Sequence, residues 1–293
     1  MSLTSSPKIL LQRLGLRPKK TLGQNFLVHP HQARRIVAAP ELGGDETVVE
    51  IGAGLGALTV YLAQAARRVL ALERDPALAR FLREEIFPET PEVGVLCQDV
   101  LKFDFLGLSR EMGRPLAVVG NLPYQITSPL LFKLLAERQA LSRALLMMQQ
   151  EVGARLLAKP ATKDYGILSV LLQYHFSIKR LFSLGPANFY PAPQVDSLVL
   201  LLTPAAISPP ARDPDLLARV VKAAFGQRRK TLNNTLTARA ATFGLRPDQL
   251  RAILTALAID PARRGETLSL PEFVAVSNKI SEHRKANHQE PNP

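Results

Sequence analysis

Four short, mostly apolar runs in the first half of the chain constrain the fold most, because each ends at glycines or at a polar side chain. The runs cover 48–51, 69–72, 93–97 and 116–120. Runs of this kind are typical of strands buried on both faces, as in a parallel sheet covered by helices. Ligands of such sheets bind outside the carboxyl ends of the strands. We therefore expect the residues that follow the runs to form one site.

A glycine-rich turn follows the first run, with Gly52, Gly54 and Gly56 ahead of a helix that begins near Thr59. Glycines permit a tight turn and let a ligand approach the backbone closely, and strand–turn–helix is the context that a nucleotide-binding turn requires. The spacing is Gly-x-Gly-x-Gly and not the Gly-x-Gly-x-x-Gly of dinucleotide enzymes. Taken alone, this turn is a weak signal.

Acidic residues end the next two runs. Glu73 lies about twenty residues after the first glycine, which is the position of a carboxylate that binds ribose hydroxyls. Asp99 follows the third run, and its carboxylate can accept a hydrogen bond from an adenine amine. Acids at two successive strand ends, together with the glycine turn, favour a nucleotide site over coincidence.

The fourth run ends at Asn121, Leu122, Pro123 and Tyr124. The exocyclic amine of adenine is a poor nucleophile because its lone pair is delocalised into the ring. A site that uses this amine needs hydrogen-bond acceptors beside it and a flat surface for the base. The Asn121 side-chain oxygen and the Leu122 carbonyl can be the acceptors, Pro123 fixes the turn, and Tyr124 can stack on the base. Alone, the tetrapeptide is also typical of a turn that ends a strand.

Taken in order, these motifs resemble those of the S-adenosylmethionine-dependent rRNA adenine N6-dimethyltransferases. Three further segments match that family, at 23–27, 189–197 and 225–232, so the resemblance covers nearly the whole chain. It is greater for the bacterial small-subunit enzymes than for the antibiotic-resistance methylases of the same superfamily. The chain departs from the family pattern where proline or a basic residue is common, at Ala53, Gln194 and Asn233.

The resemblance implies an α/β fold: a Rossmann-like class I methyltransferase domain, with a mainly parallel seven-stranded sheet and an antiparallel edge, plus a small all-α C-terminal domain. It implies S-adenosylmethionine as the cofactor, bound by Asn25, Leu27, Gly52, Gly54, Gly56, Glu73, Asp99 and Asn121. The residues implied at the target base are Asn121, Leu122, Pro123, Tyr124 and Phe189. We expect Phe189 to stack on a flipped adenine opposite Tyr124, although an aromatic side chain there is also compatible with the core.

The chain is expected to divide near residue 203, where the alternation of strands and helices stops. Residues 1–203 form the predicted methyltransferase domain, which closes with strands at 175–184 and 198–202. Residues 204–293 are predicted to be a helical RNA-binding domain that follows a proline-rich linker and ends in a disordered tail. Its expected helices cover 214–225, 229–243, 248–257 and 271–283.

The net charge of +12 and the pI of about 10.1 indicate a polyanionic partner. Runs of charge are usually solvated surfaces, but the resemblance favours contact with small-subunit rRNA in the 30S ribosomal particle. The expected RNA-binding residues are Arg228, Arg229, Lys230, Lys19 and Lys20. The last two belong to an N-terminal segment that we expect to be a flexible basic arm.

Other signals are absent from the sequence. Cys97 is the only cysteine and lies in a predicted buried strand, so neither a disulfide nor a cysteine-based zinc site is expected. His29 and His31 lack companion residues at metal-ligand spacing, and no metal is expected. No apolar run approaches the ~18 residues of a spanning helix, and no signal segment is seen. We expect a soluble, cytoplasmic, monomeric protein that does not bind membranes.

The expected function is S-adenosylmethionine-dependent N6,N6-dimethylation of adenines in small-subunit rRNA during ribosome biogenesis. One alternative is a DNA adenine N6-methyltransferase, although these enzymes more often carry Asp-Pro-Pro-Tyr. The other is a non-catalytic RNA-binding or ribosome-assembly factor that keeps the fold. Such a factor would be signalled by loss of an acid or of Asn121, and all of these residues are present.

Overall fold

The chain forms two compact units. The computed structural model describes residues 6–205 and 208–289. Contacts between residues divide the chain into residues 1–153 with 177–204, and residues 154–176 with 205–293. The sequence predicts that 154–176 belong to the first domain, because their helical pattern continues the alternation of strands and helices. In the structure, this segment packs with the C-terminal helices instead.

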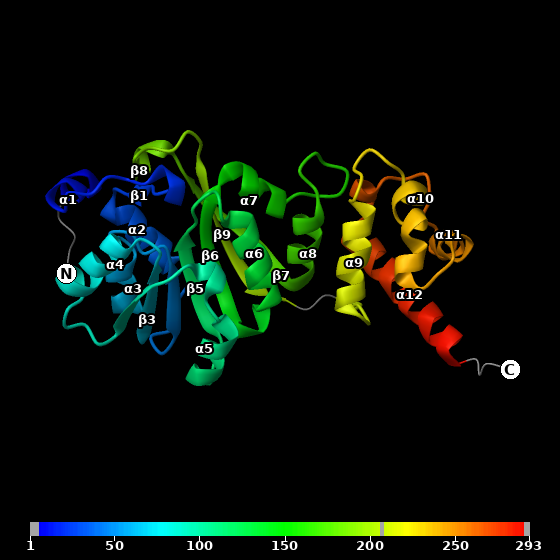
Figure 1. Cartoon of the computed structure of the whole chain (residues 1–293), viewed down its shortest axis with the longest axis horizontal. Coiled ribbons are helices and arrows are strands. Elements are labelled where there is room, and N and C mark those ends of the chain that lie inside the picture. The colour runs from blue at the N-terminus through cyan, green and yellow to red at the C-terminus, as the bar shows by residue number, and fades with distance from the viewer. Residues whose placement is uncertain (1–5, 206–207, 290–293) are drawn as a thin grey trace. The chain divides into compact units, whose positions relative to one another are not determined.

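A seven-stranded sheet forms the centre of the first unit, and Figure 1 draws it in colours from blue to yellow-green. In spatial order, its strands are β4 (Val93–Cys97), β3 (Arg68–Glu73), β2 (Thr47–Ile51), β5 (Leu116–Asn121), β6 (Leu141–Gln149), β9 (Ser197–Pro204) and β7 (Phe176–Leu184). The strands from β4 to β6 are parallel, and β9 is antiparallel to β6. The prediction of a mainly parallel sheet with an antiparallel edge is confirmed.

The order of the strands reverses at β2. The chain runs outward from β2 through β3 to β4, and then returns to place β5 on the other side of β2. Such a reversal leaves a crevice at the carboxyl ends of the two strands, where ligands of open α/β sheets bind. Ile51, the last residue of β2, pairs with Gly120 of β5. The glycine turn and the Asn-Leu-Pro-Tyr tetrapeptide therefore leave the sheet side by side.

Burial differs between the centre of the sheet and its edge. All residues of β2 and the first five of β5 are buried, which explains their near-continuous apolar character. Cys97 is exposed at the end of β4, so the prediction of a buried thiol is wrong. The reason is that β4 is an edge strand with only β3 beside it, and its last two residues are exposed.

Helices connect the strands of the first unit, and both α3 and α4 contact β3. The helices are α1 (Pro7–Arg13), α2 (Pro30–Ala38), α3 (Thr59–Ala65), α4 (Pro76–Phe81), α5 (Phe105–Met112) and α6 (Thr127–Ala136), and α7 (Gln150–Leu156) begins in this unit and ends in the second. A separate two-stranded sheet pairs β1 (Phe26–Leu27) with β8 (Phe189–Tyr190) in the antiparallel sense. This small pairing joins the N-terminal segment to the proline-rich loop that the sequence analysis singled out.

The N-terminal segment is folded, in contrast to the flexible arm that we expected. Its helix α1 buries Leu10 and Leu11 in the hydrophobic core of the first unit. The expectation of a flexible arm rested on the basic residues of the segment. The two leucines outweigh them, because burying a leucine side chain stabilises the folded segment by ~1.5–3 kcal/mol each.

The second unit is helical, as predicted. Its helices are α8 (Ile167–His175), α9 (Pro214–Ala224), α10 (Leu232–Thr235), α11 (Pro247–Ala256) and α12 (Leu270–Gln289). The helix expected over 229–243 is interrupted: α10 is followed by a 3-10 segment, Thr237–Phe243, in which Arg239 has a non-helical φ of −108°. Helix α12 continues through residues expected to be disordered, and 290–293 lie outside the described residues.

Candidate functional site

Two adjoining pockets lie at the strand ends of the first unit. Asn25, Phe26, Gly52, Gly54 and Asn121 line both of them. These residues come from the N-terminal segment, the turn after β2 and the end of β5. The site thus lies where the strand order reverses, as the topology requires.

The glycine turn between β2 and α3 has a backbone that favours glycine. Gly52, Gly54 and Gly56 have φ values of 72°, 58° and 85°, in the left-handed region that other residues rarely adopt. A Cβ atom on Gly54 would lie 3.2 Å from the Phe26 ring, and one on Gly56 would lie 3.0 Å from Leu82. The turn is therefore held closely between its neighbours, with the backbone of Gly52 and Gly54 lining the pockets.

Glu73 is held rigidly at the end of β3. One carboxylate oxygen accepts a hydrogen bond from the Gly54 N–H and the other accepts one from the Asp75 N–H, each at 2.8 Å. Burial raises the pKa of Glu73, and the two backbone hydrogen bonds oppose that effect. The side chain lines the second pocket, so its remaining lone pairs can accept hydroxyl groups of a ligand.

Asp99, at the end of β4, lies in the same pocket. Its Oδ1 accepts a hydrogen bond from the Leu101 N–H at 3.0 Å, and its Oδ2 lies 3.6 Å from the Arg74 guanidinium. The two acids predicted from the strand ends are therefore brought together, as expected. The first is fixed by backbone donors alone, and the second by one backbone donor and a weaker ion pair.

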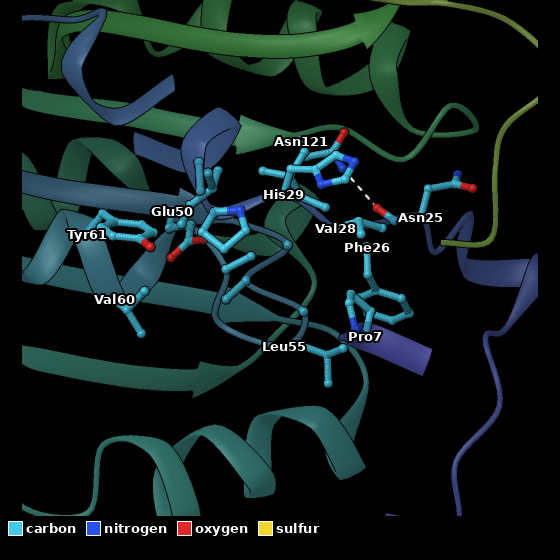
Figure 2. A pocket seen from close by; sticks show the side chains of 18 of the residues that line it. Pro7, Asn25, Phe26, Val28, His29, Glu50, Leu55, Val60, Tyr61 and Asn121 are labelled. Carbon is cyan, nitrogen blue, oxygen red and sulfur yellow. Dashed lines mark hydrogen bonds between the residues drawn. The ribbon is translucent and has the colours of Figure 1, made fainter. Parts of the chain in front are cut away.

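The side chain of Asn121 has a defined orientation. Its Nδ2 donates a hydrogen bond to the backbone carbonyl of Asn25 at 3.0 Å, drawn as the dashed line in Figure 2. A carbonyl oxygen can only accept, so the atom that faces it must be the amide nitrogen. The other amide atom, Oδ1, is thereby left as an acceptor in the pocket.

The residues after Asn121 are fixed by the neighbouring strand. The Leu122 N–H donates to the Met147 carbonyl of β6 at 2.8 Å, while the Leu122 carbonyl forms no hydrogen bond with the residues that the structure describes. Tyr124 is half-buried and lines the second pocket, and burial raises its pKa. The site thus offers two free acceptors beside an aromatic ring.

Phe189 does not lie in either pocket. Its side chain is 4% exposed and belongs to the core of the first unit, where β8 pairs it with Leu27 of β1. The core role that the sequence analysis left open is therefore the one that the structure shows. Leu27 is also buried, yet it lines the first pocket. Phe189 is buried because β8 pairs with β1, and the sequence around Phe189 carries no signal for this pairing.

Of the basic residues singled out by sequence, two have partners that hold them. Lys19 Nζ lies 2.8 Å from Asp75 Oδ2. In the helical unit, Arg228 Nε donates to Glu266 at 2.6 Å and its guanidinium also donates to the Lys163 carbonyl. Arg229, Lys230 and Lys20 are exposed, and their side chains form no hydrogen bond or ion pair with described residues.

Glu50 was not predicted as a site residue; it lies inside β2 and lines the first pocket beside Tyr61 (Figure 2). Glu50 is 1% exposed, and its Oε2 has no hydrogen-bond partner among the described residues. Burial raises its pKa to about 7, and the nearby Glu73 charge adds to the shift. The signal in the sequence was an acid in an otherwise apolar strand, directly before the glycine turn.

The described residues contain no group of three or more His, Cys, Asp or Glu side chains arranged to hold a metal ion. None of the helices over 6–205 and 208–289 combines the length and apolar character needed to cross a membrane.

Comparisons with known proteins agree with this geometry. The ribosomal RNA small subunit methyltransferase A of Geobacter sulfurreducens is 45% identical over 271 residues, which cover 91% of this chain and 96% of that protein. The protein of the same name from Bacillus mycoides is 42% identical over 282 residues, covering 94% and 96%.

Solved structures show the same fold. A dimethyladenosine transferase from Plasmodium falciparum matches with a TM-score of 0.74 and 22% identity, over 88% of this chain and 98% of that one. The 23S rRNA methyltransferase ErmE matches with a TM-score of 0.66 and 25% identity, over 88% and 100%. The family model described as ribosomal RNA adenine dimethylase matches residues 15–275. The chain therefore belongs to the ribosomal RNA adenine dimethylase family.

Proposed function

We propose that this protein transfers methyl groups from S-adenosylmethionine to N6 of adenine in small-subunit rRNA, and that it does so twice to give N6,N6-dimethyladenosine. The observation that carries the proposal is the fixed amide of Asn121, whose Oδ1 is left as an acceptor between the two pockets. Family membership supports the reaction, and the names of the relatives support the choice of small-subunit rRNA.

The residues of the two pockets fit this cofactor. Glu50 lines the first pocket, and its buried carboxylate, with Oε2 unpartnered among the described residues, suits a cationic group such as the cofactor's ammonium. Glu73 would accept hydrogen bonds from ribose hydroxyls and Asp99 from the adenine amine, while the backbone of Gly52 and Gly54 admits close approach. When bound, S-adenosylmethionine supplies a methyl group on a sulfonium, which is already a strong electrophile.

The protein's own task is to hold the target amine. Asn121 Oδ1 and the Leu122 carbonyl would accept its two hydrogens, which draws the nitrogen lone pair out of conjugation with the ring. Tyr124 would support the flipped base by stacking. The proton released by the methylated amine passes to water. After the first transfer one N–H remains, so a single acceptor still orients the amine for the second.

The helical unit would supply contacts to RNA phosphates. Arg229 and Lys230 of this unit, and Lys20 of the N-terminal segment in the first unit, have exposed, unpaired side chains within the described part of the chain. Arg228 is engaged with Glu266 and the Lys163 carbonyl, so we assign it to the structure of the unit. A 30S particle as substrate implies action in the cytoplasm, where we propose that the protein works as a monomer.

Asn121→Ala should separate catalysis from cofactor binding. Removing the acceptor should lower methyl transfer to 30S particles by roughly 100-fold or more, by analogy with the loss of one oriented polar group at a developing charge. Calorimetric affinity for S-adenosylmethionine should stay within a few-fold. A folded variant that no longer binds the cofactor would show that Asn121 was assigned the wrong role. Inactivity of the wild type on both 30S particles and duplex DNA would favour the alternative that the protein is a non-catalytic assembly factor.

Glu73→Gln should weaken cofactor affinity by roughly 1–3 kcal/mol, the cost of an unsatisfied buried hydrogen-bonding group. The amide cannot accept from both Gly54 and Asp75, since one of its two atoms is a donor. Glu84→Gln is a matched control, because Glu84 is exposed and its side chain forms, among the described residues, only a surface ion pair with Arg80. Equal cofactor affinity in the two variants, measured by calorimetry, would remove Glu73 from the site.

Substitutions in the basic run should separate RNA contact from structure. If Arg229 and Lys230 bind phosphates, replacing both with methionine should reduce the slope of log affinity against log salt by about 1.4–1.8, at ~0.7–0.9 per contact. Arg228→Met should leave the slope nearly unchanged and lower the melting temperature, because it removes the hydrogen bonds that Arg228 donates to Glu266 and to the Lys163 carbonyl. The reverse pattern would assign the phosphate contact to Arg228.

A further inference from the structure

Residues 19–25 form a strap that joins two parts of the site. Lys19 Nζ lies 2.8 Å from Asp75 Oδ2, and Gln24 Nε2 donates to the same oxygen at 3.1 Å. The two ends of the strap are also linked to each other, since the Lys19 N–H donates to Gln24 Oε1 at 2.8 Å. One side of the strap is therefore fastened to the segment that follows β3.

Asp75 is the centre of these contacts. Its side chain is 3% exposed, and its Oδ1 caps helix α4 by accepting from the Ala77 N–H at 3.1 Å. Its own N–H donates to Glu73. Burial raises the pKa of Asp75, but the hydrogen bonds from Lys19, Gln24 and Ala77 together outweigh this effect and lower it. A single buried carboxylate thus connects a helix start, the strap and the proposed ribose ligand.

The other side of the strap packs on the tetrapeptide after β5. The Asn25 carbonyl accepts the hydrogen bond that orients the Asn121 amide. Gly23 has a φ of 62°, and a Cβ atom added to it would lie 3.2 Å from Pro123 Cβ. The Gln125 side chain donates to the Lys20 carbonyl at 3.4 Å. The strap therefore spans the second pocket, from the end of β3 to the end of β5.

We propose that Asp75 is a positioning residue for methyl transfer: through the strap, it fixes the Asn25 carbonyl and thereby the direction of Asn121 Oδ1. Lys19 belongs to this tether and does not bind RNA. The inference rests on the proposed function, since it concerns how the same site orients the target amine. Displacement of a reacting group by about 1 Å can lower a rate by about 100-fold, so a tether of this kind has a measurable effect.

A purely structural role for Asp75 as a helix cap gives a different expectation. Asparagine caps helices about as well as aspartate, so Asp75→Asn keeps the cap through its Oδ1. Its Nδ2 would then face Lys19 Nζ and Gln24 Nε2, which are both donors. The variant therefore removes the tether and retains the helix start. Lys19→Met breaks the same tether from a half-exposed side chain and leaves the chemical identity of Asp75 unchanged, although that buried carboxylate loses its cationic partner.

The test is the single-turnover rate of methyl transfer at saturating cofactor and 30S particles. We expect Asp75→Asn and Lys19→Met each to lower this rate about 10-fold or more, with the double variant no slower than the slower single one. Both variants leave a buried polar group without its partner, so their melting temperatures should fall, and the rates are compared at a temperature at which each variant is fully folded by circular dichroism. The RNA-binding salt slope of Lys19→Met should equal that of the wild type. Asp45→Asn is the matched control, because it breaks an ion pair with Arg114 in which the Asp45 side chain is 70% exposed, and its rate should be unchanged.

Each other outcome overturns the inference in a recognisable way. Wild-type rates in both variants would show that the tether does not position Asn121, and fully additive losses in the double variant would show that the two residues act separately. A shallower salt slope for Lys19→Met would return Lys19 to RNA binding. In all three of these cases the wild type is active, so only the positioning role of Asp75 fails. If the wild type itself transfers no methyl group, the proposed function fails.

Discussion

The hydrogen bond from the Asn121 side chain to the Asn25 carbonyl is the contact on which the site depends. It joins residues 96 positions apart and fixes which atom of the amide faces the pocket. Without it, the amide could rotate and present a donor to an amine that needs acceptors. The sheet brings Asn121 to the crevice, but only the N-terminal segment determines its orientation. The orientation of the Asn121 acceptor therefore depends on the folding of the N-terminal segment, which buries Leu10 and Leu11.

Charge is distributed in the site according to burial. Glu50 and Glu73 both lie in a poorly solvated region, where burial raises the pKa of each. Glu73 is compensated by backbone N–H groups, whereas one oxygen of Glu50 has no partner among the described residues. A buried acid whose charge is only partly compensated is costly to the free protein. Binding of a cationic cofactor would offset that cost at this acid near the carboxyl end of a buried strand.

Local sequence signals predicted the sheet and most of the pocket. Apolar runs indicate buried strands from local sequence alone. In a parallel sheet the residues at the carboxyl ends of neighbouring strands lie together, and Gly54, Glu73, Asp99 and Asn121 do line one pocket. Contacts between distant segments carried no such signal. Pairing of β1 with β8 buried Phe189, and the edge position of β4 exposed Cys97. The ion pair of Lys19 with Asp75 could not be predicted either, because a lysine in the sequence is the same whether its side chain forms an ion pair or is free on the surface.

In the proposed reaction, a site built from neutral acceptors methylates one adenine amine twice. The most direct measurement is a time course of 30S particles treated with the protein and isotope-labelled S-adenosylmethionine, followed by mass spectrometry of the rRNA nucleosides. We expect N6-methyladenosine to rise early and then to be converted to N6,N6-dimethyladenosine at the same position. Accumulation of the monomethyl product with cofactor in excess, and no conversion, would contradict it.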